Sequence, residues 1–158
     1  MCLEGGVAEL PPAPGSYALQ MVLSAPARMQ IGALGEFDFP AGAYLYTGNA
    51  FGTGGLRART SRHLESGRKR HWHIDYLLPH VQISRVYFVC ANPPLECAWS
   101  QALAELPPAC VPVPRFGASD CRSGCKAHLV LLPRVDEQAI HKLLEKISHP
   151  AAVEIWHT

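Results

Sequence analysis

The 158-residue sequence contains no apolar run near the roughly 18 residues that a membrane-spanning helix needs. Residues 1–14 also lack the basic segment followed by an apolar segment that marks a secretory signal peptide, so we expect a cytoplasmic protein with no membrane partner. Net charge is almost absent, at +1, and therefore gives no indication of a nucleic-acid partner. An apolar fraction of 48% beside a charged fraction of 17% excludes a disordered chain and is typical of one globular domain.

The six cysteines are even in number, a count that would predict disulfide bonds in a secreted chain. Without an export signal we expect reduced thiols, most of them small buried apolar groups. Cys121, Cys125 and His128 are close enough in sequence to ligate zinc, for which we expect four ligands. The candidates for the fourth ligand are His71, His73, Asp120 and Cys110. The alternatives are a loop in which Ser119 and Asp120 hydrogen-bond their own backbone, and a loop that brings either residue to the edge of an active site.

The hydrophobic pattern predicts an α+β fold, in which a small mixed or antiparallel central sheet of about three strands is flanked by helices. Apolar, β-prone segments bounded by glycine or proline predict strands at 17–23, 42–48, 82–90 and 129–132, with a further strand or bulged connection at 30–35. Helices are predicted at about 55–64, 73–78, 95–103 and 135–147. We divide the chain into a turn-rich leader (1–14), a single domain (15–147) and a C-terminal tail (148–158).

Basic residues gather in one stretch although the whole chain is nearly neutral. Between Arg57 and Arg70 there are six basic residues and one acid, Glu65. Such a stretch attracts phosphate, and the alternative is an ordinary solvated helix face. Trp72 follows the stretch, either as a core residue or as a platform on which a base stacks. The candidates for nucleic-acid contact are Arg57, Arg62, Lys69, Arg70, His71 and Trp72.

Five residues that can serve phosphodiester hydrolysis follow one another along the chain. Tyr17 and Tyr46 are on two predicted strands, each two residues from a glycine, and Arg59 and His63 share one helix face because they are four residues apart. Glu96 is in the first turn of a later helix. Hydrolysis needs a proton acceptor, a cation beside the phosphate and help for the leaving oxygen, and these residue types can supply all three. Each residue alone is weak evidence, since a tyrosine on a strand is usually part of the core.

The order of these residues resembles the GIY-YIG nuclease superfamily. Gly15-Ser16-Tyr17 and Tyr46-Thr47-Gly48 correspond to its two naming motifs, with Ser16 and Thr47 in place of isoleucine, which we expect to repack the core without loss of chemistry. The helix with Arg59 and His63 follows, and Glu96 corresponds to the family's metal-binding glutamate. The resemblance spans roughly residues 15–132. Further segments resemble the Uri-type branch of that superfamily, namely 42–50, 55–56, 62–63, 71–77 and 116–121.

The resemblance implies a divalent-metal-dependent endonuclease, with DNA as the favoured substrate. It assigns Tyr17 as the general base or the relay to it, Tyr46 to the attacking water or the phosphate, and Arg59 to the scissile phosphate. It also implies that His63, or one of His71 and His73, assists proton transfer, and that Glu96 holds one Mg²⁺ or Mn²⁺ ion. Since an ordinary tyrosine has a pKa near 10, Tyr17 needs a nearby cation or a metal-bound water to act as a base.

Two alternatives to an endonuclease stay open. The first is a non-catalytic nucleic-acid-binding module with the same fold, and the second is a structural protein stabilised by zinc at Cys121, Cys125 and His128. We expect no appended domain that would select a target, so a protein partner for targeting is one option.

Overall fold

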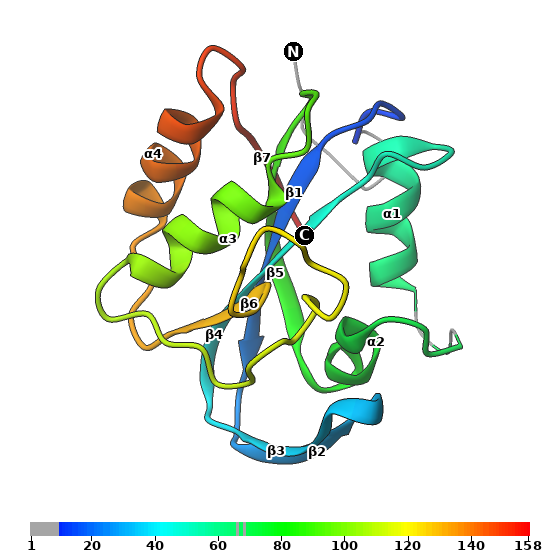
Figure 1. Ribbon diagram of the computed structural model, residues 1–158, viewed down its shortest axis with the longest axis vertical. Coiled ribbons are helices and arrows are strands. Elements are labelled where there is room, and N and C mark those ends of the chain that lie inside the picture. The colour runs from blue at the N-terminus through cyan, green and yellow to red at the C-terminus, as the bar shows by residue number, and fades with distance from the viewer. Residues whose placement is uncertain (1–9, 66, 68) are drawn as a thin grey trace.

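The computed structural model describes residues 10–65, 67 and 69–158, and their central feature is a five-stranded antiparallel sheet with the strand order β6-β4-β1-β5-β7 (Figure 1). Its strands are β1 (Ser16–Leu23), β4 (Gly42–Asn49), β5 (Gln82–Val89), β6 (Leu129–Leu132) and β7 (Glu154–His157). A separate two-stranded hairpin consists of β2 (Ala27–Ile31) and β3 (Gly35–Phe39). The helices are α1 (Gly55–Leu64), α2 (His73–Leu77), α3 (Glu96–Glu105) and α4 (Glu137–Ser148). The part of the predicted leader at 1–9 lies outside the described residues.

The predicted α+β class is confirmed, but the expectation of about three strands in the central sheet is wrong. The sequence pattern had indicated strands at the positions of β1, β4, β5 and β6, and all four belong to this sheet; the fifth, the edge strand β7, comes from the C-terminal tail and pairs with β5. It has four residues, of which only Trp156 is buried, so no hydrophobic period could reveal it. The segment 30–35 is also not a strand of its own. β2 ends at Ile31 and a 3-10 turn follows, because Gly32 and Gly35 take φ angles of +47° and +114°.

The sheet has an apolar cluster on each face, as alternation along the strands requires. Tyr17, Leu19 and Met21 of β1 belong to the first cluster, whereas Ala18 between them belongs to the second. Side chains from α1, α2 and the hairpin cover the first face, and those from α3 and α4 cover the second. The result is a three-layer arrangement with β1 in the middle of the sheet.

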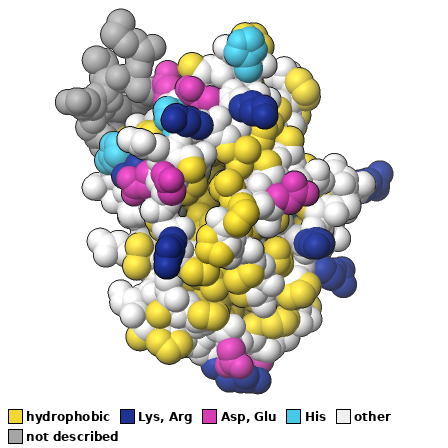
Figure 2. Space-filling view, turned by 90° about the vertical axis from the view of Figure 1, so that its left-hand side faces the viewer, with side chains coloured by type: hydrophobic (Ala, Val, Ile, Leu, Met, Phe, Trp, Pro, Cys, Tyr) yellow, Lys and Arg dark blue, Asp and Glu magenta, His cyan; other side chains and the backbone are white. Residues whose placement is uncertain are grey.

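The two outer sides of the molecule differ in character. α4 is at the left in Figure 1 and α1, with its basic residues, is at the right. Figure 2 shows the left-hand side, where apolar side chains form a continuous band. The basic residues of α1 are therefore on the far side of the molecule from this band. Among the described residues, no helix has both the length and the apolar character to cross a membrane.

Candidate functional site

Tyr17 and Tyr46 stand on adjacent central strands because β1 and β4 pair with a register that places Tyr17 opposite Gly48. The ring of Tyr17 lies directly over this glycine. A methyl group at position 48 would come within 2.5 Å of the Tyr17 hydroxyl oxygen and 2.6 Å of its Cζ. Gly15 is equally constrained, since a side chain there would collide with the carbonyl oxygen of Val89. The two glycines beside the tyrosines are thus required by packing.

Gly48→Ala is expected to destabilise the protein by about 1–3 kcal/mol, the usual cost of forcing a group into a filled site, because the new methyl group displaces the Tyr17 ring. Gly52→Ala is the matched control, since no atom lies within 4 Å of a methyl group at that position. Chemical denaturation of the two variants measures the difference. Equal stabilities would contradict the close packing of Tyr17 on β4.

The hydroxyl of Tyr17 is hydrogen-bonded to Nε2 of His63 at 2.7 Å. Both side chains are buried, and Nδ1 of His63 has no hydrogen-bond partner. Burial raises the pKa of Tyr17 well above its ordinary value, and the charges of Tyr46 and Glu96 act in the same direction, whereas Arg59 opposes them. Burial lowers the pKa of His63 to about 4, with Arg59 contributing. At neutral pH the pair therefore consists of a protonated tyrosine and a neutral histidine.

This buried histidine predicts that stability falls on acidification. Between the pKa of 6.5 in an unfolded chain and about 4 in the folded one, only the unfolded state takes up the proton, so stability declines as the pH falls through this interval. The loss attributable to His63 is up to about 3 kcal/mol. Urea unfolding of the parent and of His63→Gln, from about pH 7 down to about pH 4, measures it. Parallel pH profiles for the two proteins would contradict this origin.

Glu96, the first residue of α3, completes the group around the tyrosines. Its Oε1 accepts a hydrogen bond of 2.8 Å from the side-chain amide of Asn49, at the end of β4. Burial raises the pKa of Glu96, and the Asn49 hydrogen bond and the Arg59 charge oppose this rise. Tyr46 responds to the same charges, since burial and then Glu96 raise its pKa while Arg59 lowers it. The charge of Arg59 therefore lowers the pKa of all three acidic groups, and the charge of Glu96 raises the pKa of both tyrosines.

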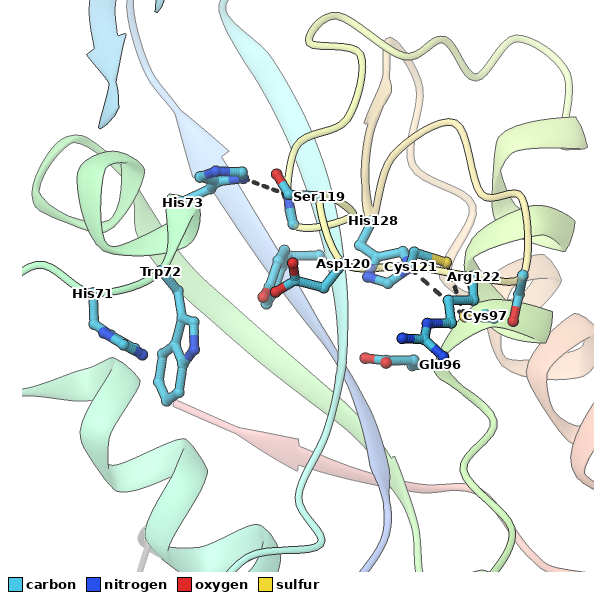
Figure 3. Close-up of a pocket in the computed structure, with 13 residues that line it drawn as sticks. His71, Trp72, His73, Glu96, Cys97, Ser119, Asp120, Cys121, Arg122 and His128 are labelled. Carbon is cyan, nitrogen blue, oxygen red and sulfur yellow. Dashed lines mark hydrogen bonds between the residues drawn. The ribbon is translucent and has the colours of Figure 1, made fainter. Parts of the chain in front are cut away.

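A cavity of about 550 Å³ opens beside this group (Figure 3). Tyr46 and Glu96 line it, and in Figure 3 Trp72 and His73 lie across it from Glu96 and His128. The irregular segment 117–128 supplies much of the wall around Glu96. The volume is within the range of about 300–1,000 Å³ that is usual for sites that bind small ligands.

The residues around Trp72 that the sequence predicted to contact nucleic acid interact with one another within the protein. The guanidinium carbons of Arg59 and Arg62 lie 4.3 Å and 4.0 Å from the centre of the Trp72 ring. Arg62 also forms a two-pronged ion pair with Asp75, both N–O distances being 3.1 Å. Asp75 in turn accepts the backbone N–H groups of His71 and Trp72, each at 2.8 Å. The Trp72 ring is therefore already in contact with two arginines of the protein itself.

The remaining predicted contacts are spread more widely. Arg57 donates from Nε to the carbonyl oxygen of Leu10 at 2.8 Å and so holds the described end of the leader against α1. Arg70 lies over the ring of Tyr76, 5.0 Å from its centre, and Lys69 is exposed. Nδ1 of His73 accepts the backbone N–H of Gly117 at 2.8 Å, which ties α2 to the opposite wall of the cavity. His71 lines the same cavity.

A second constellation lies against the cavity. The potential ligand atoms of Cys97, Cys121, Cys125 and His128 all lie within 4.8 Å of one another, so this group could hold a metal ion. Gly124 has a φ of +78°, which allows the tight turn that brings Cys125 back to Cys121. Burial raises the pKa of Cys121, but hydrogen bonds from the backbone of Cys125 and Ser123 outweigh this and lower it. Burial raises the pKa of Cys125 to about 12.

Two residues of these constellations were not predicted from the sequence. The fourth member of the cysteine–histidine group is Cys97, and none of the candidates His71, His73, Asp120 and Cys110 belongs to it. Cys97 is on α3, far from the others in sequence, so no local spacing could indicate it. Asn49 was also missed, although it directly follows the Tyr46-Thr47-Gly48 motif, where a polar side chain at the end of a strand is a recognisable signal.

Residues 16–149 match a family model described as a domain of unknown function, DUF123. No curated protein and no solved structure gives a significant match to the chain.

Proposed function

Because the chain belongs to the DUF123 family, whose description names no activity, we propose its function from the site itself: divalent-metal-dependent hydrolysis of phosphodiester bonds in nucleic acid, with DNA as the favoured substrate. The resemblance of its motifs to the GIY-YIG nucleases supports the same proposal. The observation that carries it is the 2.7 Å hydrogen bond between Tyr17 and His63. Arg59 and Glu96 are close enough to shift the pKa of this tyrosine, Arg59 downward and Glu96 upward.

The proposed proton path runs from the attacking water through Tyr17 to His63. With its raised pKa, Tyr17 cannot simply be ionised in the resting site. It can pass its proton to Nε2 of His63 while it takes one from water, provided that His63 carries its own proton on Nδ1. Burial makes His63 a weak acceptor, and positive charge near Tyr17 is needed to favour the transfer.

Arg59 supplies such a charge and is suited to the phosphate. Its guanidinium lowers the pKa of Tyr17 and of Tyr46, so it is close to the proposed reacting groups. The Trp72 ring, 4.3 Å from the guanidinium carbon, limits the positions that the side chain can take. An arginine fixed in advance stabilises the charge that develops on a phosphate without reorganising during the reaction.

The residues present fit an oxygen-preferring divalent ion. Asn49 holds Oε1 of Glu96, and the carboxylate lines the cavity. Mg²⁺ and Mn²⁺ are commonly held by one or two carboxylates and keep several waters, for which the cavity has room. Bound there, the ion would supply positive charge beside both tyrosines and a Lewis acid for the phosphate.

The competing proposal is a nucleic-acid-binding module without catalysis. The salt bridge of Arg62 with Asp75 and the hydrogen bond of Arg57 with Leu10 count against it, because they engage two of the predicted phosphate contacts within the protein. A binding surface built from Arg59, Lys69 and Arg70 would still be available.

Incubation of the purified chain with supercoiled plasmid DNA, branched DNA and RNA, in Mg²⁺ or Mn²⁺, tests the proposal. We expect nicked or linear products from at least one DNA substrate, and none when EDTA replaces the metal. A Glu96→Gln preparation purified in parallel is the blank for contaminating nucleases. Binding without any cleavage, measured by gel shift on the same substrates, would favour the non-catalytic module.

A further inference from the structure

We propose that Cys97, Cys121, Cys125 and His128 bind one Zn²⁺ ion in a closed tetrahedral site that fixes the cavity wall. Two distances between ligand atoms of this group match such a site. Zn–S bonds of about 2.3 Å and Zn–N bonds of about 2.0–2.1 Å, at tetrahedral angles, place two sulfurs about 3.8 Å apart and a sulfur and a nitrogen about 3.6 Å apart. Sγ of Cys97 lies 3.6 Å from Sγ of Cys121 and 3.8 Å from Nε2 of His128.

The segment 119–125 has little else to hold it in place. Apart from its two cysteines it contains only Ser, Asp, Arg and Gly, and each of these residues is exposed. Gln101 on α3 contacts it by donating to the carbonyl oxygen of Ser123 at 3.1 Å and to Sγ of Cys125 at 3.5 Å. A segment without apolar side chains cannot bury enough surface to stabilise one conformation, and a structural metal ion compensates for that deficit.

The kind of ligand selects zinc over Mg²⁺, Mn²⁺ and iron. Three soft thiolates and an imidazole nitrogen suit zinc, whereas Mg²⁺ and Mn²⁺ prefer oxygen ligands. All four ligand atoms lie within 4.8 Å of one another, which fits a single ion, whereas a two-iron cluster would hold its ligands on separate metals.

The ion would join three parts of the chain around the cavity. Cys97 comes from the first turn of α3, Cys121 and Cys125 from the irregular wall, and His128 from the residue before β6. Cys97, Cys121 and His128 also line the cavity beside Glu96. A site whose four positions are all filled by protein ligands is structural. This zinc site is independent of the proposed nuclease activity, and either proposal can fail without the other.

Metal analysis of the protein, purified without chelators and with a cleaved tag, tests the site. We expect one zinc per chain by mass spectrometry of the metals, and loss of most of that zinc in Cys97→Ser. Cys110→Ser is the matched control, because Cys110 is an exposed cysteine outside the group and should keep full zinc content. Full zinc retention in Cys97→Ser, or less than a tenth of an equivalent in the parent even after zinc is added, would overturn the proposal.

Two further measurements do not depend on a folded variant. Removal of the ion from the parent with a strong chelator should lower Tm by roughly 5–10 °C, and re-addition of zinc should restore it. Replacement of zinc by Co²⁺ should produce the intense absorption of thiolate-to-cobalt charge transfer together with the visible bands of tetrahedral cobalt. A Tm that the chelator leaves unchanged, a cobalt spectrum without thiolate bands, or stoichiometric iron in place of zinc would each contradict the site.

Discussion

Replacing Glu96 with glutamine is expected to reduce metal-dependent cleavage by about 10²-fold or more, because it removes the carboxylate that would hold the divalent ion. The substitution keeps the shape of the side chain, and its carbonyl oxygen can still accept the hydrogen bond from Asn49. Stability should be unchanged or higher, since burial already raises the pKa of this carboxylate and so disfavours its charge. Single-turnover kinetics measure the cleavage rate, and calorimetry measures the affinity for Mn²⁺. We expect the rate and the affinity to decline together.

The control for Glu96→Gln is Glu105→Gln. Glu105 is the last residue of the same helix and is exposed, so its replacement changes the net charge equally without touching the cavity. We expect parental rates and Mn²⁺ affinity from this variant. Undiminished cleavage by Glu96→Gln would exclude Glu96 as the metal ligand, while equal losses in both variants would point to a general charge effect.

Tyr17→Phe is the second large expected effect, again a loss of about 10²-fold or more in the cleavage rate, because the proposed proton path passes through its hydroxyl. The substitution also removes the 2.7 Å hydrogen bond to His63, and we expect a destabilisation of about 1–2 kcal/mol from the buried imidazole that loses its partner. The loss should lie in the rate at saturating substrate, with nucleic-acid affinity nearly unchanged, because Arg59 and the basic residues remain.

Tyr87→Phe separates the proton path from simple loss of a buried hydroxyl. Tyr87 is also buried, and its hydroxyl donates to Oε1 of Gln20 at 2.9 Å, but it packs in the cluster on the other face of the sheet. We expect a similar loss of stability and an unchanged cleavage rate. Equal rate losses in Tyr17→Phe and Tyr87→Phe would show that Tyr17 acts through stability alone.

The parts of the fold that local patterns encode were predictable. Helix 55–64 and strand 129–132 lie where the sequence indicated them, because a pair of glycines precedes the helix, and a continuous apolar run that ends at Pro133 marks the strand. The strand pairing that brings Tyr17 opposite Gly48 was not predicted from the sequence. The need for glycine at position 48 becomes clear once the register is known, because the Tyr17 ring occupies the space that a side chain there would fill.

Contacts between distant segments were not predictable. Cys97 joins Cys121 and His128 across the fold, and Arg62 pairs with Asp75 because α1 and α2 meet at Trp72. Neither pairing follows from spacing along the chain, since helix and strand periods say which face a residue occupies but not which element faces it. The edge strand β7 was missed for a different reason, because four residues are too few to display a period.

The backbone that carries the two tyrosines and the backbone of the facing cavity wall differ in how they are held by hydrogen bonds. Tyr17 and Tyr46 stand on strands that are paired along both edges, β1 between β4 and β5, and β4 between β1 and β6. The wall at 117–128 has no helix or strand, and is tied to its surroundings by isolated backbone hydrogen bonds, such as Thr47 N–H to the His128 carbonyl, and by side-chain contacts, such as Gly117 N–H to His73. Exchange of these wall amides with solvent deuterium should therefore be faster than exchange in β1. In the proposed nuclease, this division would let the irregular wall adjust to a bound nucleic-acid strand while Tyr17 and Tyr46 keep their positions.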